Sequence, residues 1–368
     1  MKVATTTTTR RSPTRRNILY SGILGVILVL VSVWETRHLE SVHQVFDLAS
    51  YSAEMSAAPA VPSLRFLKTE SPGWSVFNST STMPLYHDRG FKCRWERYES
   101  ERNPGKSAEM CVHTSLDLIS ERIAKTGHWR DCLSVSRQYH ASMRATRKKR
   151  SKESTLYHLE IGANIGACVV ELLLSNDHVH IVAFEPFPKN VFCLTSTLLR
   201  NADFVRRVTV YPVALGSTPG SMQIAMQQRQ NLGSVRIYTD KADLVRQQHL
   251  FARRYPVDGK VETIAVERLD DLLATTHQDS VVVPFAKLDA QGYECAILDG
   301  MPNLLSSIPR IISEVELESL SSYPNCSGQL LFERLRKVGM TLYWYRESGR
   351  LHPLPDEEQN INVVGVRP

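Results

Sequence analysis

The stretch from residue 156 to residue 186 constrains the fold more than any other part of the chain. An apolar, strand-forming run over residues 156–161 leads directly into a turn that contains Gly162 and Gly166. A short helix-forming run follows, and then a second apolar run that ends at Glu185. Strand, glycine turn, helix and strand in this order predict the start of a parallel α/β sheet.

The turn after the first strand has the composition of a ligand-binding loop. It reads Glu160-x-Gly162-x-Asn164-x-Gly166, and glycine and asparagine are the residues that most readily adopt positive φ. Glycine also lets a ligand approach the backbone, and the first turn of the helix offers N–H groups to a carboxylate. Glu185 ends the second strand, where a carboxylate can accept both hydroxyls of a ribose. These residues predict a nucleoside-binding site.

The spacing separates two classes of cofactor. Dinucleotide enzymes favour G-x-G-x-x-G, which brings a pyrophosphate onto the end of the helix. Here Asn164 stands between the glycines, and Glu160, which has no role beside a pyrophosphate, can hold a cationic amino-acid group. The pattern therefore favours S-adenosylmethionine over a nicotinamide cofactor. A tight turn in an α/β domain that binds no ligand is the alternative interpretation.

Strands and helices continue to alternate after Glu185. Strands are expected at 208–212, 261–266, 283–289, 310–316, 341–345 and 360–366, with helices at 189–200 and 328–338 and an inserted hairpin within 221–238. This order predicts an α/β fold with a mainly parallel, seven-stranded sheet, helices on both faces and a final antiparallel hairpin. Ala214 falls in a loop at the strand ends, where small side chains leave room for an adenine ring.

Two acidic residues follow the strand at 283–289. Asp289 ends that strand, and a carboxylate beside the cofactor can orient an amine or take a proton from a hydroxyl. Glu294 opens the next helix, where it is either a second catalytic carboxylate or a cap that suits the helix dipole. Asp289, Glu294 and Glu314 could together hold Mg²⁺, but nothing in the sequence has metal-ligand spacing, so we expect no resident metal.

Residues 18–34 carry no charge and are rich in Ile, Leu and Val, at the short limit for a membrane-spanning helix. Four arginines precede them and one closely follows, which predicts a type II signal anchor. Residues 1–17 would then be a cytosolic basic tail, and the catalytic domain would be lumenal, in the endoplasmic reticulum or Golgi. A mitochondrial or plastid transit peptide is an alternative, because residues 1–34 are rich in Arg, Ser and Thr and lack acids; a cleaved signal peptide is another.

The chain has a formal net charge of +6, but the distribution of this charge argues against a nucleic-acid partner. Residues 1–34 and 144–152 together hold eleven basic residues and no acidic ones, so the rest of the chain is net negative. The partners that we expect are therefore a small-molecule, glycan or lipid acceptor and, through residues 18–34, a membrane.

Two segments separate the expected anchor from the sheet. Residues 35–86 are rich in Ser, Ala, Pro and Thr, which predicts a flexible stem. Asn78 begins an N-glycosylation triplet that has meaning only if this stem is lumenal. Residues 87–153 are richer in Trp, Tyr and Cys and predict a cap that packs on the main domain at 154–368.

Five of the seven cysteines fall into two sets by position. In a lumenal chain, a disulfide among Cys93, Cys111 and Cys132 of the cap is expected. Cys168 and Cys193 lie on predicted helices of the main domain, where we expect buried thiols.

Four motifs in this order and spacing resemble the FkbM family of methyltransferases, over residues 156–366. They are Glu160-x-Gly162-x-Asn164-x-Gly166, Phe184-Glu185-Pro186, Val213-Ala214-Leu215-Gly216 and Leu288-Asp289-x-Gln291-Gly292-x-Glu294. The resemblance implies a class I, Rossmann-like methyltransferase domain that uses S-adenosylmethionine, most often for O-methylation. Carried over by motif, the glycine turn and Glu160 would hold the amino-acid moiety, Glu185 the ribose and Ala214 the adenine, with Asp289 and Glu294 near the acceptor.

Two functions remain open at this point. The first is a membrane-anchored methyltransferase that O-methylates a hydroxyl of a glycan, lipid or small metabolite, with a carboxylate as base. The second is a catalytically silent module that binds S-adenosylmethionine or acts as a scaffold at a membrane. The cap and the N-terminal segments lie outside the resemblance, so the identity of the acceptor does not follow from it.

Overall fold

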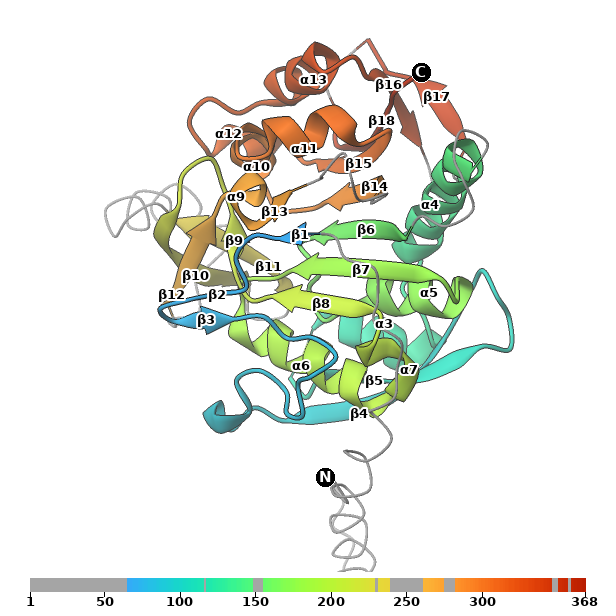
Figure 1. Cartoon of the computed structure of the whole chain (residues 1–368), viewed down its shortest axis with the longest axis vertical. Coiled ribbons are helices and arrows are strands. Elements are labelled where there is room, and N and C mark those ends of the chain that lie inside the picture. Colours follow the sequence, from blue (N-terminus) through green and yellow to red (C-terminus); the bar gives the residue numbers. More distant parts are fainter. Residues whose placement is uncertain are drawn as a thin grey trace, which may run out of the picture. The chain divides into compact units, whose positions relative to one another are not determined.

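The computed structural model describes residues 65–115, 117–147, 155–228, 231–238, 261–274, 282–345, 350–356 and 359–368 (Figure 1). The expected tail at 1–17 and the expected anchor at 18–34 lie outside these residues. Within them, no helix has the length and apolar character needed to cross a membrane.

The centre of the fold is an eight-stranded mixed sheet with the strand order β17-β16-β18-β15-β14-β6-β7-β8 (Figure 1). From β15 to β8 all neighbours are parallel, and β18, β16 and β17 join by antiparallel pairing. The strands are β6 (Leu156–Ile161), β7 (Val179–Phe184), β8 (Val208–Tyr211), β14 (Val282–Leu288), β15 (Arg310–Val315), β16 (Thr341–Tyr345), β17 (Leu351–Pro353) and β18 (Ile361–Val366). The expected α/β arrangement is confirmed, whereas the expected count of seven strands is wrong because β17 adds an edge strand beside β16.

Successive side chains of each strand point to opposite faces of the sheet, so the buried core has one part on each face. Leu159 and Val182 belong to one buried cluster, whereas Ile181 and Phe285 belong to the other. Helices α5 (Ala167–Ser175) and α6 (Pro188–Arg200) contribute to the cluster of Ile181. The cluster of Leu159 takes side chains from α10 (Glu294–Asp299), α11 (Pro302–Ser307), α12 (Leu317–Ser321) and α13 (Gly328–Lys337). Helices thus cover both faces, as expected.

A second, four-stranded sheet has the order β11-β10-β12-β9. It contains the expected hairpin, because β10 (Gly220–Gln228) pairs antiparallel with β11 (Asn231–Tyr238). The other strands are β9 (Ala214–Leu215) and β12 (Val261–Glu267). Two short helices flank these elements along the chain. α7 (Ala202–Val205) precedes β8, and α9 (Leu269–Leu272) follows β12.

Of the stem expected at 35–86, residues 35–64 lie outside the described part of the chain, and residues 65–86 are packed rather than flexible. β1 (Arg65–Phe66) pairs with β13 (Leu273–Ala274), and β2 (Glu70–Ser71) pairs with β3 (Trp74–Ser75). Phe77 is fully buried and forms a bridge with Val210 of the central sheet. Because composition does not show which apolar residues meet a partner far away in sequence, the Ser- and Pro-rich pattern hid these contacts.

The cap comprises a hairpin and two helices. The hairpin pairs β4 (Cys93–Glu99) with β5 (Ser107–His113), and a 3₁₀ turn at His87–Arg89 precedes it. α3 (Leu118–Thr126) begins at Asp117, whose carboxylate accepts a hydrogen bond from the Ser120 N–H. α4 (Asp131–Arg147) packs along α5 and β14 (Figure 1).

The cysteines form three disulfides within the described residues. Cys93–Cys111 agrees with the expected pairing inside the cap. The second disulfide corrects the expectation for Cys168, which is no free thiol but is bonded to Cys132 at the start of α4. The third joins Cys295 of α10 to Cys326. Cys193 is a buried free thiol, as expected.

Candidate active site

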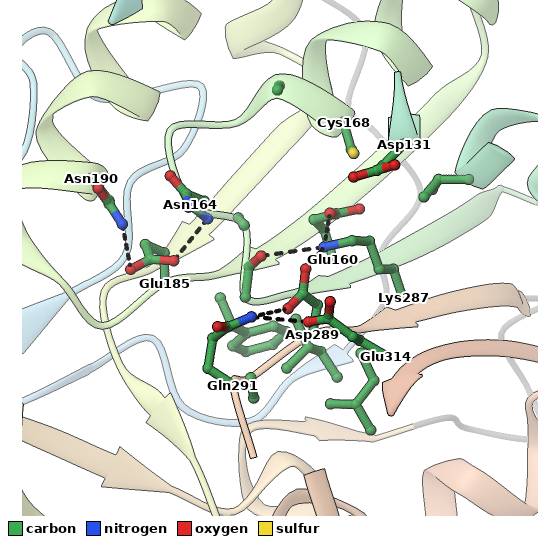
Figure 2. A pocket seen from close by; sticks show the side chains of 18 of the residues that line it. Asp131, Glu160, Asn164, Cys168, Glu185, Asn190, Lys287, Asp289, Gln291 and Glu314 are labelled. Atoms are coloured by element: carbon green, nitrogen blue, oxygen red, sulfur yellow. Dashed lines mark hydrogen bonds and ion pairs between the residues drawn. The ribbon is translucent and has the colours of Figure 1, made fainter. Parts of the chain in front are cut away.

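A cavity of about 380 Å³ lies at the carboxyl ends of the central parallel strands. Its lining includes residues from the ends of β6, β7 and β14 and from the short strand β9, which contains Ala214 where the sequence predicted a loop. The lining residues that Figure 2 labels come from β6 and the glycine turn, the β7 end, β14 and the loop after it, β15, and the first turns of α4, α5 and α6. The cavity thus brings together Glu160, Glu185 and Asp289, which are far apart in the sequence.

The glycine turn needs the residues that it has. Gly162 has a φ of 80°, and a Cβ there would collide with the backbone carbonyl of Asp289. Gly166 has a φ of 89°, and a Cβ would collide with the side chain of Leu194. Asn164 also adopts positive φ, at 51°. The positive φ values expected for this turn are therefore confirmed, and the turn packs against the backbone at the end of β14.

Glu185 is held at the end of β7 by three donors. Its Oε2 accepts the Asn164 N–H at 2.8 Å, and its Oε1 accepts the Phe187 N–H at 3.0 Å and the Asn190 side-chain N–H at 3.3 Å (Figure 2). The residue is 5% exposed, and burial raises its pKa to about 7 although these hydrogen bonds oppose the rise. A carboxyl in this state, which lines a cavity, is suited to accept hydroxyl groups from a ligand.

Glu160 lies behind the glycine turn in a buried ionic cluster. Lys287 Nζ lies 3.2 Å from one of its oxygens, and His158 Nε2 lies 2.6 Å from the other. Burial alone would raise the pKa of Glu160, but the charge of Lys287 and the hydrogen bond from His158 lower it below its ordinary value. Glu160 is therefore a carboxylate at neutral pH and can balance a cationic ligand group.

Asp289 lies on the other side of Lys287. Its Oδ2 is 3.1 Å from Lys287 Nζ, and its Oδ1 accepts a hydrogen bond of 3.1 Å from the Gln291 amide (Figure 2). The same amide donates to Glu314 Oε2 at 2.9 Å. Burial would raise the pKa of Asp289, but Lys287 keeps it below its ordinary value, whereas the Asp289 charge raises the pKa of Glu314 well above its own. Asp289 is thus the ionised member of this pair, and Glu314 takes up a proton more readily than an ordinary glutamate.

Two other predicted site residues have different positions. Ala214 lines the cavity, as the adenine expectation requires. Glu294 is 1% exposed and is not among the lining residues; its Oε1 accepts the Ala290 N–H at 2.8 Å at the start of α10. Its position fits the capping alternative, and it does not join Asp289 and Glu314 in the cluster considered for Mg²⁺.

The contacts of the remaining carboxylates disfavour a bound metal ion. The Asp289 oxygens are engaged by Lys287 and Gln291, which bring a positive charge and a donor where a cation would bind. Within the described parts of the chain, the side chains close enough to share a metal are Cys93, Cys111 and Cys193, and two of these form a disulfide.

Sequence reasoning missed three residues that organise this site. Lys287 joins Glu160 to Asp289, Gln291 joins Asp289 to Glu314, and Asn190 supports Glu185. A signal for Lys287 was present, since it precedes Asp289 by two residues on one strand and so lies on the same face. Asn190 lies on α6, and only the packing of that helix shows that its side chain reaches Glu185.

Residues 160–337 match the family model described as the methyltransferase FkbM domain. No curated protein matches the chain significantly.

Several solved structures match at low identity. A precorrin-6y C5,15-methyltransferase from Geobacter metallireducens has 12% identity and a TM-score of 0.29, over 62% of this chain and 87% of its own. An S-adenosylmethionine-dependent O-methyltransferase from Thermotoga maritima has 10% identity and a TM-score of 0.31, over 74% and 77%. Fibrillarin from Aeropyrum pernix, with natively bound S-adenosylmethionine, has 11% identity and a TM-score of 0.31, over 75% and 100%. Because these TM-scores are low, no residue role is transferred from these proteins.

Proposed function

Because residues 160–337 form a methyltransferase domain of the FkbM family, with S-adenosylmethionine as its cofactor, we propose that this chain O-methylates a hydroxyl of a glycan, lipid or small metabolite. The observation that carries the proposal is the cavity that joins Glu185, the glycine turn and Asp289. Glu185 can bind a ribose, the glycine turn lets a ligand approach the backbone closely, and Asp289 is an ionised carboxylate. All three line the same cavity. This combination suits a nucleoside cofactor next to a hydroxyl acceptor.

The residues around the cavity fit S-adenosylmethionine in charge and in shape. Glu185 would accept the two ribose hydroxyls, and the small side chain of Ala214 would leave room for the adenine. Glu160 would balance the amino group, and the N–H groups at the start of α5 would face the carboxylate. When bound, the cofactor supplies an activated methyl group on a sulfonium.

The contribution of the protein to such a transfer is alignment and removal of a proton. Asp289 is ionised, lies at the end of β14 and has a third of its side chain exposed to the cavity. It would orient the acceptor hydroxyl and accept its proton as the oxygen attacks the methyl carbon. Lys287 and Gln291 hold Asp289 in place for this step.

One observation favours the second function, a silent module that binds the cofactor. Lys287 and Gln291 both engage Asp289, and they lower its pKa and so weaken it as a base. Under this alternative the chain binds S-adenosylmethionine but forms no S-adenosylhomocysteine with any pool of acceptors.

Titration calorimetry with S-adenosylmethionine, followed by an assay for S-adenosylhomocysteine, separates these functions. We expect binding that Glu185→Ala weakens strongly, and turnover that Asp289→Asn lowers by roughly 10²-fold or more with binding intact. Binding without turnover on any extract, and unaffected by Asp289→Asn, would favour the silent module. If there is no binding at all, both functions are wrong.

We also propose that the domain is lumenal and anchored through residues 18–34. Three disulfides support an oxidising compartment. The Asn78 triplet gives further support, because Asn78 Oδ1 accepts from the Thr80 N–H at 2.9 Å and from its hydroxyl at 2.7 Å in an exposed turn. Expression of the full chain in secretory cells should give a glycosidase-sensitive band that Asn78→Gln removes, whereas a chain found only in mitochondria or plastids would contradict the proposal.

A further inference from the structure

Three buried side chains form a hydrogen-bonded series that ends at Glu185. Asn190 of α6 lines the cavity and donates its side-chain N–H to Glu185 Oε1 (Figure 2). The oxygen of the same amide lies 2.9 Å from Nε2 of His113, the last residue of β5 in the cap. His113 Nδ1 lies 3.7 Å from the sulfur of Cys193, three residues further along α6. His113 is fully buried and is not among the lining residues, so any effect that it has on a ligand passes through Asn190.

The chemistry of these groups fixes the direction of each hydrogen bond in the series. An ionised carboxylate only accepts, so the Asn190 amide presents its N–H to Glu185 and its oxygen to His113. An amide oxygen also only accepts, so the proton of the imidazole is on Nε2. Burial lowers the pKa of His113 to about 4, which leaves the ring neutral at pH 7 and Nδ1 free to accept. Burial raises the pKa of Cys193 to about 12, so this residue is a thiol that donates to Nδ1.

The backbone around His113 is anchored to the cap and to α6. The His113 N–H donates to Ser120 Oγ at 3.1 Å, and the Ser120 hydroxyl donates to Asp117, the residue that caps α3. Two residues earlier on β5, the Cys111 N–H donates to Thr197 Oγ1 of α6 at 2.9 Å. These contacts hold β5 against α6, and they place the imidazole beside the Asn190 amide.

The donor on His113 matters because an asparagine amide can turn over. The two ends of the amide have nearly the same shape, so packing alone does not select the orientation that points the N–H at Glu185. The Nε2 proton selects it, because the reversed amide would place N–H against N–H and a carbonyl oxygen against the carboxylate. Buried groups without a partner are costly, so the reversed orientation is disfavoured.

We propose that His113 is a positioning residue for the cofactor: by donating to Asn190, it holds the Glu185 carboxylate in the orientation that accepts the two ribose hydroxyls. The inference rests on the proposed contact between Glu185 and the ribose. His113 lies outside residues 160–337, which match the family model. The affinity for the cofactor therefore depends on the cap as well as on that segment.

Two substitutions of similar size separate this role from packing. Methionine and glutamine are both unbranched and of similar length, but glutamine has an N–H donor and methionine has none. In calorimetry with S-adenosylhomocysteine, we expect His113→Met to weaken binding by about tenfold, because one buried hydrogen bond of the series is lost. His113→Gln should restore most of this loss. Equal weakening in the two variants, or unchanged affinity in His113→Met, would overturn the inference.

Thr197→Val is the matched control. It removes another hydrogen bond between β5 and α6, with little change in shape, at a residue away from the cavity lining. We expect it to lower the stability of the chain to urea but to leave the affinity for S-adenosylhomocysteine unchanged. If it weakens binding as much as His113→Met does, the effect comes from a loosened β5 and the inference is wrong.

A double-mutant cycle tests whether His113 acts through Asn190. Asn190→Leu should weaken binding, and the double variant with His113→Met should bind no more weakly than Asn190→Leu alone. Losses that multiply would show that His113 acts by another route and would overturn the inference. If His113→Met does not fold, Asn190→Leu breaks the same series in its place, and an unchanged affinity in that variant would overturn the inference.

The same titrations distinguish failure of this inference from failure of the proposed function. If the unmodified chain does not bind S-adenosylhomocysteine, the proposed function fails and the inference falls with it. If the unmodified chain binds, and Glu185→Ala weakens binding while His113→Met does not, the inference alone is wrong.

Discussion

Glu185 and Glu294 are both buried glutamates with a raised pKa, but they lie in different positions relative to the cavity. Burial raises the pKa of each from 4.5 to about 7, yet only Glu185 lines the cavity. This contrast makes Glu294 a matched control for Glu185. Both groups therefore contribute to the pH dependence of stability, whereas Glu185 alone of the two contributes to that of cofactor binding.

For Glu185 we predict that the affinity for S-adenosylmethionine increases as the pH rises through about 7, because ribose hydroxyls donate to the ionised carboxylate. Between pH 6 and pH 8 the increase due to Glu185 should be about tenfold, measured by calorimetry as the difference between the unmodified chain and Glu185→Gln. This difference removes the titration of the cofactor's own amine. Glu294→Gln should keep the full pH dependence; if it abolishes the dependence instead, the assignment is wrong.

For Glu294 the prediction concerns the free energy of unfolding. Its folded pKa lies above its ordinary value, so its stabilising contribution is present at low pH and is lost as the pH rises through about 7. Glu294→Gln should therefore be more stable than the unmodified chain at pH 8 but not at pH 4, as urea unfolding would show. Turnover should persist in this variant, since Glu294 lies outside the cavity lining.

Lys287 gives a prediction for the buried ionic cluster. Lys287→Met would leave Glu160 and Asp289 without their shared cation, and breaking a buried pair in this way costs about 3–5 kcal/mol of unfolding free energy. Lys106→Met breaks the exposed pair with Asp177 and should cost about 0–1 kcal/mol. Equal losses in thermal or urea unfolding would show that the Lys287 cluster is not buried as described.

Residues that follow strand ends could be predicted from the sequence, and residues that act through packing could not. Glu160, Glu185 and Asp289 each lie at or next to the end of an apolar run. Because the carboxyl ends of parallel strands meet at one edge of a sheet, the sequence alone places these residues close together. Asn190 and His158 contact these carboxylates only because a helix and a strand face bring them there. Glu294 was ambiguous in sequence because a carboxylate at a helix start suits the dipole equally well.

At the scale of elements, α4 connects the cap to the cofactor site. Its first residue, Asp131, lines the cavity, and the next, Cys132, forms a disulfide with Cys168 at the start of α5. The glycine turn ends at Gly166, directly before α5. The disulfide therefore joins the start of α4, in the cap, to the start of α5 beside the glycine turn.

We predict that the double substitution Cys132→Ser and Cys168→Ser lowers the unfolding free energy by roughly 3–4 kcal/mol, since the bond closes a loop of 36 residues. It should also lower turnover, because Asp131 of the cavity lining is no longer fixed by this bond. The pair Cys295→Ser and Cys326→Ser, a loop of similar length away from the cavity lining, is the control. If both pairs lower turnover equally, the Cys132–Cys168 bond does not position the cavity lining.

Regular elements were easier to predict than short or remote ones. The strands and helices from β6 to α6 have strong apolar periodicity and flanking turns, so their bounds agree closely with the sequence. β17 escaped prediction because it spans three residues and ends in Pro353, which is tolerated on an edge strand. The Cys132–Cys168 bond escaped because its two cysteines belong to segments that were assigned to different parts of the molecule.

At the scale of the whole molecule, residues 160–337, which match the family model, supply only part of the cavity lining. The described residues between 65 and 147 contribute to both buried clusters and pair with the edge strand β8, and several of their side chains line the cavity. Long-range packing of this kind depends on contacts that composition does not report. The organisation of the cofactor half could thus be predicted, whereas the part of the cavity lining that the cap supplies could not.

The central claim is that this cavity holds S-adenosylmethionine with its ribose on Glu185. The most direct measurement is a crystal structure of the chain grown with saturating S-adenosylhomocysteine. We predict density in the cavity, with the two ribose hydroxyls on the Glu185 carboxylate and the sulfur directed toward Asp289. Density for the ligand elsewhere, or an empty cavity at a concentration where calorimetry shows saturation, would contradict the account.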